Sequence, residues 1–483
     1  MAKKRKLKKM KIINLIISII LIILMIINTY LVLKYDVLPT KYLATFIFVV
    51  DIIPILFIFL MNKKGIIKPI KVISTILSII YIIVLCFSFF YINKTFSFID
   101  SINDVIVQKE DYYFKVLENS NIKTIDDLKN KKVGIYKNSK YDELIKKLDE
   151  KISVEKIEYQ DPVELFTDLQ DGKIDAVLIN DTVLGLLETE LSYLNLELKN
   201  IYTISIPLKN KTEDIVKIVD VTNTPFSIYI AGGDAYGSID KVMNTDVNMI
   251  VSVNPTSHKI LLTSIPRDYY VVLPGQGDEA YDKLTHAGYY GIEESIKAVQ
   301  KLLDIDINYY AKINFSTIEK VVDAIGGIDV ESDFNFKFSD PGRNLYFSYK
   351  KGINHLNGKQ ALGFARERES FRDGDVQRVK DQQKVVTAIV NKVSSSKTLI
   401  SSYTNILDAI SENFATNLDT KSISRLVKLQ LNDMPKWEIE SQNLVGFDGS
   451  ARCYSIPNMN LYVMKQDENS VTASKEKIKE FFK

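Results

Sequence analysis

The sequence predicts a membrane-anchored α/β protein with three transmembrane helices, a small α/β lobe and a larger α/β domain that carries the chemistry. Three observations lead to this fold class. Long apolar runs are confined to residues 1–92. Beyond them, short apolar strands alternate with amphipathic helices in two separate stretches. Finally, four of the nine arginines fall between residues 366 and 378, although lysine supplies most of the positive charge.

Three apolar runs, at residues 12–33, 42–61 and 72–92, are each long enough to cross a bilayer as a helix. About 20 residues are needed for a span. The alternative is a set of buried core helices, but three such runs so close together favour spans. Asp51 lies within the second run, where it is either functional or simply faces the helix bundle.

The lysines predict the orientation of these spans. Residues 1–11 hold seven Lys or Arg and residues 62–71 hold four, whereas residues 34–41 hold two. Because positive loops stay inside, residues 1–11 form a cytoplasmic tail and everything after residue 92 lies outside. No small-residue cleavage site follows the first run, so we interpret it as a retained anchor. The prediction is a multi-pass cell-membrane protein with extracellular C-terminal domains.

The charge balance limits the partners of the exported part. Residues 1–92 carry a net +11 and the whole chain +2, which leaves about −9 for residues 93–483. An acidic exported portion predicts no general binding of nucleic acid or of anionic lipid surfaces. Two cysteines exclude a disulfide framework, and the three histidines have no zinc spacing.

Residues 93–223 are predicted to hold a linker and an accessory α/β domain. The strings DDLKNKKVGIYKNS and LQDGKIDAVLIND resemble one lobe of bacterial periplasmic solute-binding proteins. Receptors of that type for amino acids usually clamp the ligand carboxylate with an arginine, but residues 101–223 contain none. There is also sequence for little more than one lobe. We therefore favour a spacer or a module that docks an envelope-assembly protein over a ligand sensor.

Residues 224–395 are predicted to form the catalytic α/β domain, and residues 396–483 a C-terminal extension packed on it. The predicted strands are FSIYIAGGD, VNMIVSVNP, KILLTSIPRDYYVVLP, YYAKINF and IDVE. The predicted helices are IEESIKAVQKLL and STIEKVVDAIGG, the latter closed by Gly326 and Gly327.

The arginine cluster lies in LGFARERESFRDGDVQRVKDQQ. Its alternation predicts a strand with Arg366 and Arg368 on one face. A turn follows, with Asp375 placed to cap a helix on which Arg378 and Gln382 share a face. Arginine forks and a helix N-terminus both favour phosphate. The alternative is a solvated strand face held by cross-strand ion pairs.

Two further strings bear on this choice. Asp234 follows the first predicted strand of this domain and Asp246 precedes the next, so both carboxylates meet at one sheet edge if these strands are neighbours. Two carboxylates with few other protein ligands suit Mg²⁺, although an Asp in a glycine turn is usually only a turn residue. In SIPRD, Arg267 either joins the phosphate-facing group or pairs with Asp268.

Six motifs occur in order in residues 224–395 and together resemble the LytR–CpsA–Psr family. They are AGGDAYG, TDVNMIVSVNP, SIPRDYYV, YDKLTHAGYYG, VVDAIGGIDV and HLNGKQALGFARERESFRDGDVQRVKDQQ. Three spans and an accessory module before this domain are similar to the capsule-associated branch. The resemblance implies an α/β/α sandwich with an apolar pocket for a polyprenyl chain. It also implies transfer of a glycopolymer, such as capsular polysaccharide or teichoic acid, from undecaprenyl pyrophosphate to peptidoglycan.

The resemblance also implies the site residues. The metal-binding aspartates of the family fall on Asp234 and Asp246, and its acid before the last arginine falls on Asp375. The positions that hold the pyrophosphate are Arg267, Arg366, Arg368 and Arg378, with Gln382 beside them and Lys283 as a further contact. Asn244 and Thr245 stand where the family often has Arg-Ser, which removes one nearby positive charge.

The chemistry of these residue types agrees with that reading. Mg²⁺ and several arginines would neutralise the leaving pyrophosphate while a peptidoglycan sugar hydroxyl attacks in line. A polyprenyl-pyrophosphate phosphatase would use the same residues with water as acceptor. A non-catalytic envelope regulator or scaffold that binds lipid-linked glycopolymer is the other alternative.

Overall fold

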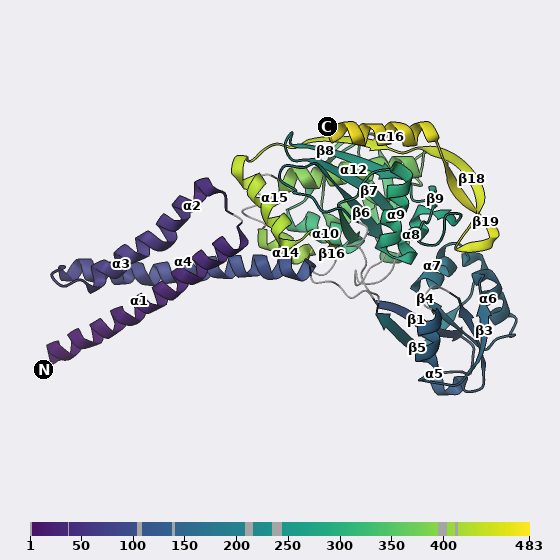
Figure 1. Cartoon of the computed structure of the whole chain (residues 1–483), viewed down its shortest axis with the longest axis horizontal. Helices are drawn as coiled ribbons and strands as arrows, with labels where there is room; N and C mark the ends of the chain where they lie inside the picture. The colour runs from purple at the N-terminus through teal and green to yellow at the C-terminus, as the bar shows by residue number, and fades with distance from the viewer. Residues whose placement is uncertain are drawn as a thin grey trace.

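The computed structural model describes residues 2–36, 38–103, 109–137, 141–207, 216–233, 244–394, 403–410 and 414–483. A bundle of long helices leads into two α/β bodies (Figure 1). The accessory lobe lies at the far end of the molecule from the bundle, beyond the larger domain (Figure 1).

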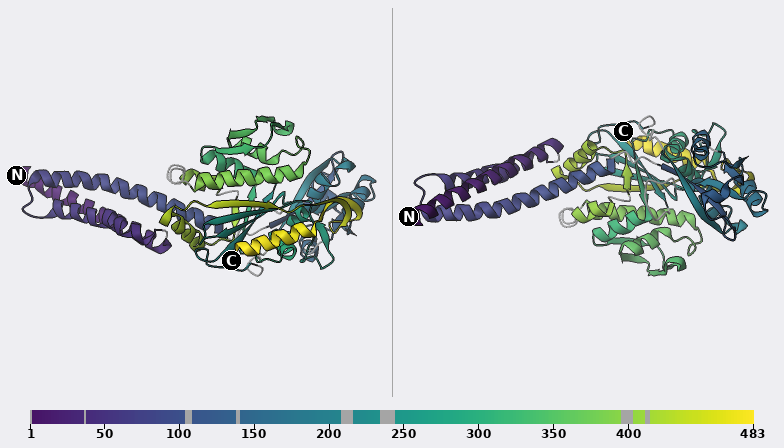
Figure 2. Two further views of the ribbon diagram at one scale, coloured as in Figure 1. Left: turned by 90° about the horizontal axis from the view of Figure 1, so that it is seen from above. Right: turned by 90° about the horizontal axis from the view of Figure 1, so that it is seen from below.

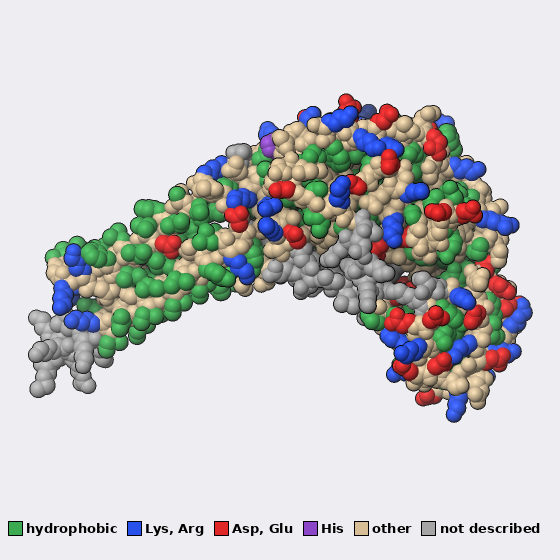
Figure 3. Space-filling model, viewed as in Figure 1, with side chains coloured by type: hydrophobic (Ala, Val, Ile, Leu, Met, Phe, Trp, Pro, Cys, Tyr) green, Lys and Arg blue, Asp and Glu red, His purple; other side chains and the backbone are tan. Residues whose placement is uncertain are grey.

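Three helical segments of the bundle are long and apolar enough to span a membrane, as the sequence predicts: Met10–Tyr35, Thr40–Asn62 and Lys68–Ser97. The helices themselves are α1 (Ala2–Tyr35), α2 (Thr40–Ile47), a π-helical turn (Phe48–Ile52), α3 (Ile53–Asn62) and α4 (Lys68–Asn103). Hydrophobic side chains cover the visible face of this bundle (Figure 3). Asp51 accepts a hydrogen bond from Thr29 Oγ1, 3.1 Å from each carboxylate oxygen, so it faces a neighbouring helix.

The last part of α4 runs past the predicted span and packs directly on the C-terminal part of the chain. Lys94 Nζ lies 2.7 Å from Asp408 of α14 (Tyr403–Ile410). At the end of α1, Asp36 pairs with Lys428 of α15 (Thr420–Asp433) at 2.8 Å. The helical bundle is therefore fastened to the larger domain by side-chain contacts as well as by the chain itself.

The accessory lobe is an α/β unit, as the sequence predicts. Its five-stranded sheet has the order β3-β2-β4-β1-β5, with β2 parallel to both β3 and β4 and β1 antiparallel to β4 and β5. Its elements are β1 (Lys109–Leu117), β2 (Lys132–Tyr136), α5 (Tyr141–Asp149), β3 (Glu155–Tyr159), α6 (Pro162–Gln170), β4 (Ala176–Asn180), α7 (Asp181–Thr189) and β5 (Leu198–Pro207), with short 3-10 turns at Ile125–Leu128 and Ser192–Leu194.

The larger domain is built on a six-stranded mixed sheet with the order β16-β11-β6-β7-β8-β17. These strands are β6 (Phe226–Gly233), β7 (Val247–Asn254), β8 (Lys259–Ile265), β11 (Tyr309–Asn314), β16 (Phe414–Thr416) and β17 (Glu438–Asn443). The two edge strands β16 and β17 come from the tail beyond residue 395. The tail therefore completes the sheet in addition to packing on the domain.

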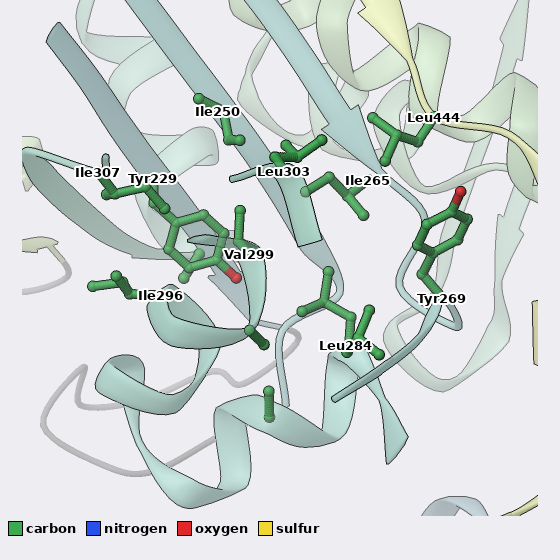
Figure 4. Close-up of a cluster of buried hydrophobic side chains, with 14 of the residues drawn as sticks. Tyr229, Ile250, Ile265, Tyr269, Leu284, Ile296, Val299, Leu303, Ile307 and Leu444 are labelled. Carbon is green, nitrogen blue, oxygen red and sulfur yellow. The ribbon is translucent and has the colours of Figure 1, made fainter. Parts of the chain in front are cut away.

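Helices cover both faces of this sheet, which makes the domain the α/β/α sandwich that the family resemblance implies. On one face, α9 (Ile292–Leu303) and α16 (Glu468–Phe481) bury residues such as Ile296 and Ile478 against Tyr229 and Ile250. Figure 4 shows Ile296 and Val299 of α9 beside Tyr229. On the other face, α12 (Asp375–Val393) and α15 pack on Met249 and Leu262. The alternation along β7 sends Met249 and Ile250 to opposite faces, because successive side chains of a strand do so.

A smaller unit lies on the outer side of α12, and Figure 2 shows it, in green, projecting from one face of the sheet. It has its own core of aromatic and aliphatic side chains, including Phe336, Tyr349 and Phe364. Its elements are α10 (Phe315–Ala324), β12 (Ile328–Ser332), β13 (Phe336–Asp340), β14 (Leu345–Tyr349), β15 (Gly352–Leu356) and α11 (Gly358–Arg366). Gly326 and Gly327, with φ of +75° and +85°, end α10 as predicted.

The remaining elements join the larger domain to the accessory lobe. They are β9 (Tyr270–Val272), β10 (Tyr281–Lys283), the short helix α8 (Leu284–Ala287), a 3-10 turn (Gly288–Tyr290), and the hairpin of β18 (Gly446–Cys453) and β19 (Ile456–Gln466). Leu461 and Val463 of this hairpin share one hydrophobic core with Leu165 and Phe166 of the accessory lobe.

Candidate functional site

The register of the central sheet brings the first two candidate residues together. In the antiparallel pair β7–β8, Asn248 lies opposite Ile265. Asp246, just before β7, and Arg267, just after β8, therefore lie at the same end of the two strands. Arg267 Nη1 donates to Asp246 Oδ1 at 2.9 Å. Arg267 Nε also lies 3.4 Å from Asp268 Oδ2, so the alternative partner considered from the sequence is present as well.

β6 and β7 are neighbours in the sheet, which was the condition for Asp234 and Asp246 to meet. β6 ends at Gly233, and Asp234 itself lies outside the described residues. Its predicted role as a metal ligand stays a prediction.

The arginine cluster does not form a strand, and that prediction is wrong. Arg366 is the last residue of helix α11, and Glu367 is its C-cap. Asn357 caps the start of this helix in a reciprocal pair with Gln360. The residues that suggested alternation continue a helix whose inner face buries Ala361, Leu362 and Phe364, and that burial outweighs the local pattern. Only after Glu367, where the backbone is extended, does Arg368 emerge on the surface.

The predicted helix after the cluster is α12, with a difference at its start. The N-cap is Gly374, with φ of +43°, and Asp375 is the first helical residue without a side-chain cap bond. The Asp375 carboxylate instead pairs with the guanidinium of Arg378 one turn later. Arg378 and Gln382 share a face, as the spacing predicts, and Gln382 Nε2 donates to Ala365 O of α11 at 3.4 Å.

One cavity of about 420 Å³ unites most of the candidates. It lies where the loops after β8 and before β7 meet the C-terminal end of α11, the first turns of α12 and β13. The candidate residues that line it are Asp246, Arg267, Arg366, Arg368, Arg378 and Gln382. Three other surface hollows among the described residues are larger, at about 540, 480 and 600 Å³, but none of them is lined by an arginine. Four arginines from three separate parts of the chain therefore face one space.

The arginines in this cavity differ in burial and pairing. Arg366 has 23% of its side chain exposed, donates to Asp340 Oδ2 at 3.1 Å and lies over the ring of Phe338. Arg378 is more buried, with 10% of its side chain exposed, and its Nε has no hydrogen-bond partner among the described residues. Arg368 is exposed at the rim.

Burial and charge act in opposite directions on the two deepest guanidinium groups. Burial alone would lower the pKa of Arg267, but the carboxylates of Asp246 and Asp268 outweigh it and raise that pKa. Burial lowers the pKa of Arg378 below its ordinary value, and the nearby positive charge of Arg267 adds to this effect against the opposing pull of Asp375. The inner end of the cavity thus concentrates positive charge at a cost to the folded protein, an arrangement that a bound anion would relieve.

Lys283 is not in this cavity. It is 4% exposed, and its Nζ donates to Glu190 Oε1 of the accessory lobe at 2.6 Å and lies 3.6 Å from Asp268 Oδ1. Its predicted role as a direct phosphate contact stays a prediction. Lys283 and Arg267 are linked through the carboxylate of Asp268, with which both of them pair.

The described residues fit a Mg²⁺ ion only in a limited way. No group of three or more His, Cys, Asp or Glu side chains that could hold a metal occurs in the described part of the chain. Asp246 supplies one carboxylate at the cavity wall. One or two carboxylates with waters and substrate phosphates are a usual Mg²⁺ environment. Asp246 therefore fits an ion that the substrate helps to hold.

The structure adds lining residues that the sequence analysis did not single out. Lys337 of β13 is exposed toward the cavity, and Ile318, Phe338 and Leu362 give it an apolar wall. The alternation in FKFSD, with Phe336 and Phe338 buried and Lys337 outward, is a signal that could have found the lysine. The apolar wall has no such signal, because it is assembled from three distant elements.

The comparisons with known proteins give two family matches. The model of the LytR_cpsA_psr family matches residues 192–480, and the NMT1/THI5-like model matches residues 100–216. The second match covers the lobe that resembles solute-binding proteins. Every cavity residue named above lies within the first match.

Curated relatives match part of the chain. A polyisoprenyl-teichoic acid–peptidoglycan teichoic acid transferase, TagU, of Bacillus mycoides is 36% identical over 215 residues, which cover 44% of this chain and 67% of that one. Biofilm regulatory protein A of Streptococcus mutans is 36% identical over 217 residues, which cover 43% of this chain and 53% of that one. The chain thus spans about half to two thirds of the length of these relatives.

Solved structures include TagT bound to LI-WTA, 27% identical, which covers 55% of this chain and 94% of that one with a TM-score of 0.44. B. subtilis TagV is 27% identical and covers 54% of this chain and 98% of that one with a TM-score of 0.45. At these TM-scores the structural likeness adds nothing to the sequence match. Because the family model matches more than half of its residues, the chain belongs to the LytR_cpsA_psr family.

Proposed function

We propose that this protein is a phosphotransferase that moves a glycopolymer from undecaprenyl pyrophosphate to peptidoglycan. The observation that carries the proposal is the single cavity lined by Arg267, Arg366, Arg368 and Arg378 beside Asp246. A pyrophosphate is the compact, highly charged group that such a cluster suits, because arginine forks match phosphate oxygens. The naming of TagU relatives as teichoic acid transferases supports the transfer reaction.

In the proposed reaction, a hydroxyl oxygen of a peptidoglycan sugar forms a bond to the phosphorus next to the glycan. The bond from that phosphorus to the bridging oxygen breaks, and polyprenyl phosphate leaves with the electron pair. Arg267, Arg366 and Arg378 would hold the charge that builds up on the leaving phosphate. The hydroxyl proton passes to a neighbouring carboxylate, for which Asp375 and Asp234 are the candidates, or to water.

Mg²⁺ is the proposed cofactor, held by Asp246 and Asp234 together with phosphate oxygens. When bound, it would neutralise charge on the pyrophosphate and help to orient it. Gln382, fixed by its bond to the end of α11, would add an amide donor beside the arginines. The apolar wall of Ile318, Phe338 and Leu362 would accept the first part of the polyprenyl chain.

The three apolar helices anchor the protein in a membrane. We propose that the N-terminus is cytoplasmic and that both α/β bodies lie outside. The most basic segments that flank the spans are residues 1–11 and 62–71, and positively charged segments stay on the cytoplasmic side. This orientation would place the cavity on the side where peptidoglycan is found. The proposed glycopolymer is capsular polysaccharide or a teichoic-acid-like polymer: the accessory module between three spans and the catalytic domain is similar to the capsule-associated branch, and the TagU relatives are named as teichoic acid transferases. An envelope-assembly partner at the accessory lobe stays a prediction.

The test uses the full chain in lipid nanodiscs with a synthetic polyprenyl-pyrophosphate glycan and peptidoglycan fragments, with and without Mg²⁺. We expect Mg²⁺-dependent attachment of glycan to peptidoglycan, which Arg366→Ala abolishes. Arg343→Ala is the matched control, because Arg343 also pairs with Asp340, at 3.7 Å, but does not line the cavity. Full activity of Arg366→Ala would refute the site assignment.

Two other results would replace the proposed reaction. Release of phosphate without attachment in the presence of acceptor would indicate the pyrophosphatase. Retention of the lipid with no chemistry in either condition would indicate the scaffold reading.

A further inference from the structure

A carboxylate of the accessory lobe reaches into the charged network of the larger domain. Glu190 is the C-cap of α7, and its Oε1 accepts a hydrogen bond from Lys283 Nζ at 2.6 Å. The same oxygen lies 3.5 Å from His286 Nε2. Lys283 and His286 are 4% and 2% exposed, so this contact is buried between the two bodies.

The ion pairs continue from Glu190 to the candidate active site without a gap. Lys283 Nζ lies 3.6 Å from Asp268 Oδ1, and the other oxygen of Asp268 lies 3.4 Å from Arg267 Nε. Arg267 Nη1 then donates to Asp246 at 2.9 Å. Arg267 therefore has Asp246 as its hydrogen-bond partner inside the cavity and Asp268 as an ion-pair partner behind it, although its Nε forms no hydrogen bond among the described residues.

The surrounding packing fixes where Glu190 can lie. Tyr289 of the larger domain fits against Gly185 of α7, where a Cβ would lie 2.5 Å from the Tyr289 hydroxyl. Thr182 Oγ1 donates to Tyr289 O at 3.0 Å. Together with the core that the lobe shares with the β18–β19 hairpin, these contacts make the interface close-packed, and such an interface resists sliding.

Glu190 supplies the carboxylate that pairs most closely with Lys283 behind Arg267. The buried carboxylate of Asp282 is already engaged by His286 Nδ1 at 2.7 Å and by the backbone N–H of Ser455 at 2.7 Å. If the charge of Glu190 were lost, the nearest remaining carboxylate for the Lys283 ammonium would be Asp268. Lys283 would then compete with Arg267 for the same carboxylate and weaken the outer hold on the guanidinium.

We propose that Glu190 is a positioning residue for Arg267, acting through Lys283 and Asp268, so that the accessory lobe forms part of the active-site support. This inference rests on the proposed function for its activity readout. The proposal gives the accessory lobe a role other than solute binding. The lobe would orient Arg267, the arginine that must contact the leaving phosphate. A misplacement of about 1 Å can lower the rate about 100-fold.

The test compares Glu190→Gln with Glu188→Gln in the full chain. Both residues belong to the end of α7, but Glu188 is exposed, so its change alters the charge of the lobe without touching the network. We expect Glu190→Gln to lower kcat for glycan transfer about 10- to 100-fold with a smaller change in KM. Glu188→Gln should match the wild type. Equal kcat in Glu190→Gln and the wild type would overturn the proposal.

A double-mutant cycle separates positioning from general loss of stability. Asp268→Asn breaks the same link on the side of Arg267, so adding Glu190→Gln to it should lower kcat by no more than about 2-fold further. The melting temperature should still fall on that addition, because the Lys283 and His286 charges lose their partner in either background. Multiplicative losses of kcat would refute coupling through Asp268, even if Glu190→Gln alone folds poorly.

The wild-type protein separates this inference from the proposed function. If the wild type transfers no glycan, the proposed function fails before the variants are compared. In that event, binding of inorganic pyrophosphate with Mg²⁺ replaces kcat as the readout. Glu190→Gln should then weaken pyrophosphate binding about 10-fold relative to Glu188→Gln, and equal binding would overturn the inference.

Discussion

Replacing Arg378 with methionine should make the protein more stable and less able to bind pyrophosphate. Only 10% of this side chain is exposed, and its Nε has no hydrogen-bond partner among the described residues. Burial lowers its pKa, which means that the folded protein disfavours the charge. At neutral pH the side chain is still protonated, because arginine titrates far above that range. The charge is therefore a cost to folding that a substrate anion would offset.

The size of the effect follows from these contacts. A buried polar group without a partner costs about 1 to 3 kcal/mol. Loss of the pair with Asp375, whose side chain is 25% exposed, removes about 1 kcal/mol at most, because water can solvate the freed carboxylate. We expect Arg378→Met to raise the free energy of unfolding by about 0 to 2 kcal/mol. Losing a charge-assisted bond of about 1.5 to 3 kcal/mol should weaken anion binding about 10- to 100-fold.

The assay is thermal unfolding of the full chain with and without Mg²⁺ and inorganic pyrophosphate. Ligand at 100 times its Kd stabilises the wild type by about 2.7 kcal/mol. At the same concentration, the ligand-induced rise in Arg378→Met should fall to about 0.4 to 1.4 kcal/mol. Arg372→Met is the control, because Arg372 is exposed in the turn just before α12 and does not line the cavity. It should change stability by about 0.5 kcal/mol or less and keep the ligand effect.

Two results would refute this reasoning. If Arg378→Met without ligand is less stable than the wild type by more than about 1 kcal/mol, the charge is a net support of the fold. If pyrophosphate stabilises Arg378→Met as much as the wild type, Arg378 does not contact the anion.

Three other changes test separate parts of the structure. Asp246→Asn should abolish Mg²⁺-dependent transfer while circular dichroism stays unchanged; retained Mg²⁺-dependent transfer would remove Asp246 from the proposed metal site. Asp381→Asn should raise the free energy of unfolding by about 1 to 3 kcal/mol at pH 8 but not at pH 4. Burial raises the pKa of Asp381 to about 7, so its stabilising protonated form is lost as pH rises through 7; an equal effect at both pH values would contradict this. The buried imidazole of His286 has a pKa raised to about 9, because the pull of Asp282 and Glu190 exceeds the effect of burial. The stabilising contribution of His286 is complete below pH 6.5 and is lost as pH rises through 9. In denaturant unfolding, the free energy of unfolding of the wild type should therefore fall over this pH range, and His286→Gln should lack this fall. The groups that face His286 include Asp282, Glu190, Lys283 and Ser455, and the ring of Tyr289 stacks on the imidazole.

Much of the fold could be predicted from periodicity alone. The strands and helices around Gly326 and Gly327, and the alternating elements of the accessory lobe, form where the apolar spacing puts them. Each of these segments buries one face, and that burial agrees with its local preference. The adjacency of β6 and β7, on which the predicted meeting of Asp234 and Asp246 depends, is present in the sheet, whereas the bond between Arg267 and Asp246 was not predicted.

The α11 segment shows where this kind of prediction fails. Alternation of Arg and Glu after Ala365 indicated a strand, but the helix that starts at the Asn357–Gln360 capping box continues through Arg366. The capping box was readable in the sequence and is the stronger signal, since it satisfies backbone N–H groups that a strand would leave to other partners.

Ion pairs between residues that are far apart in the sequence cannot be predicted from a local sequence pattern. The sequence placed Lys283 as a phosphate contact because of its neighbours in the chain. The structure surrounds it with Glu190, 93 residues away, and Asp268. Which carboxylate meets a buried lysine depends on how two separately folded units dock, and docking is decided by shape across their interface.

The continuation of α4 beyond its apolar span bears on how such a protein works at a surface. A flexible tether would let a soluble domain sample a range of heights above the bilayer. Here Lys94 of the same helix that leaves the span is paired with Asp408 of α14, and Asp36 at the end of α1 with Lys428 of α15. These two ion pairs join the helical bundle to the larger domain and restrict their relative movement. A lipid-linked donor would therefore meet the arginines at a fixed height above the bilayer. Only peptidoglycan strands that approach the membrane to this height could serve as acceptors.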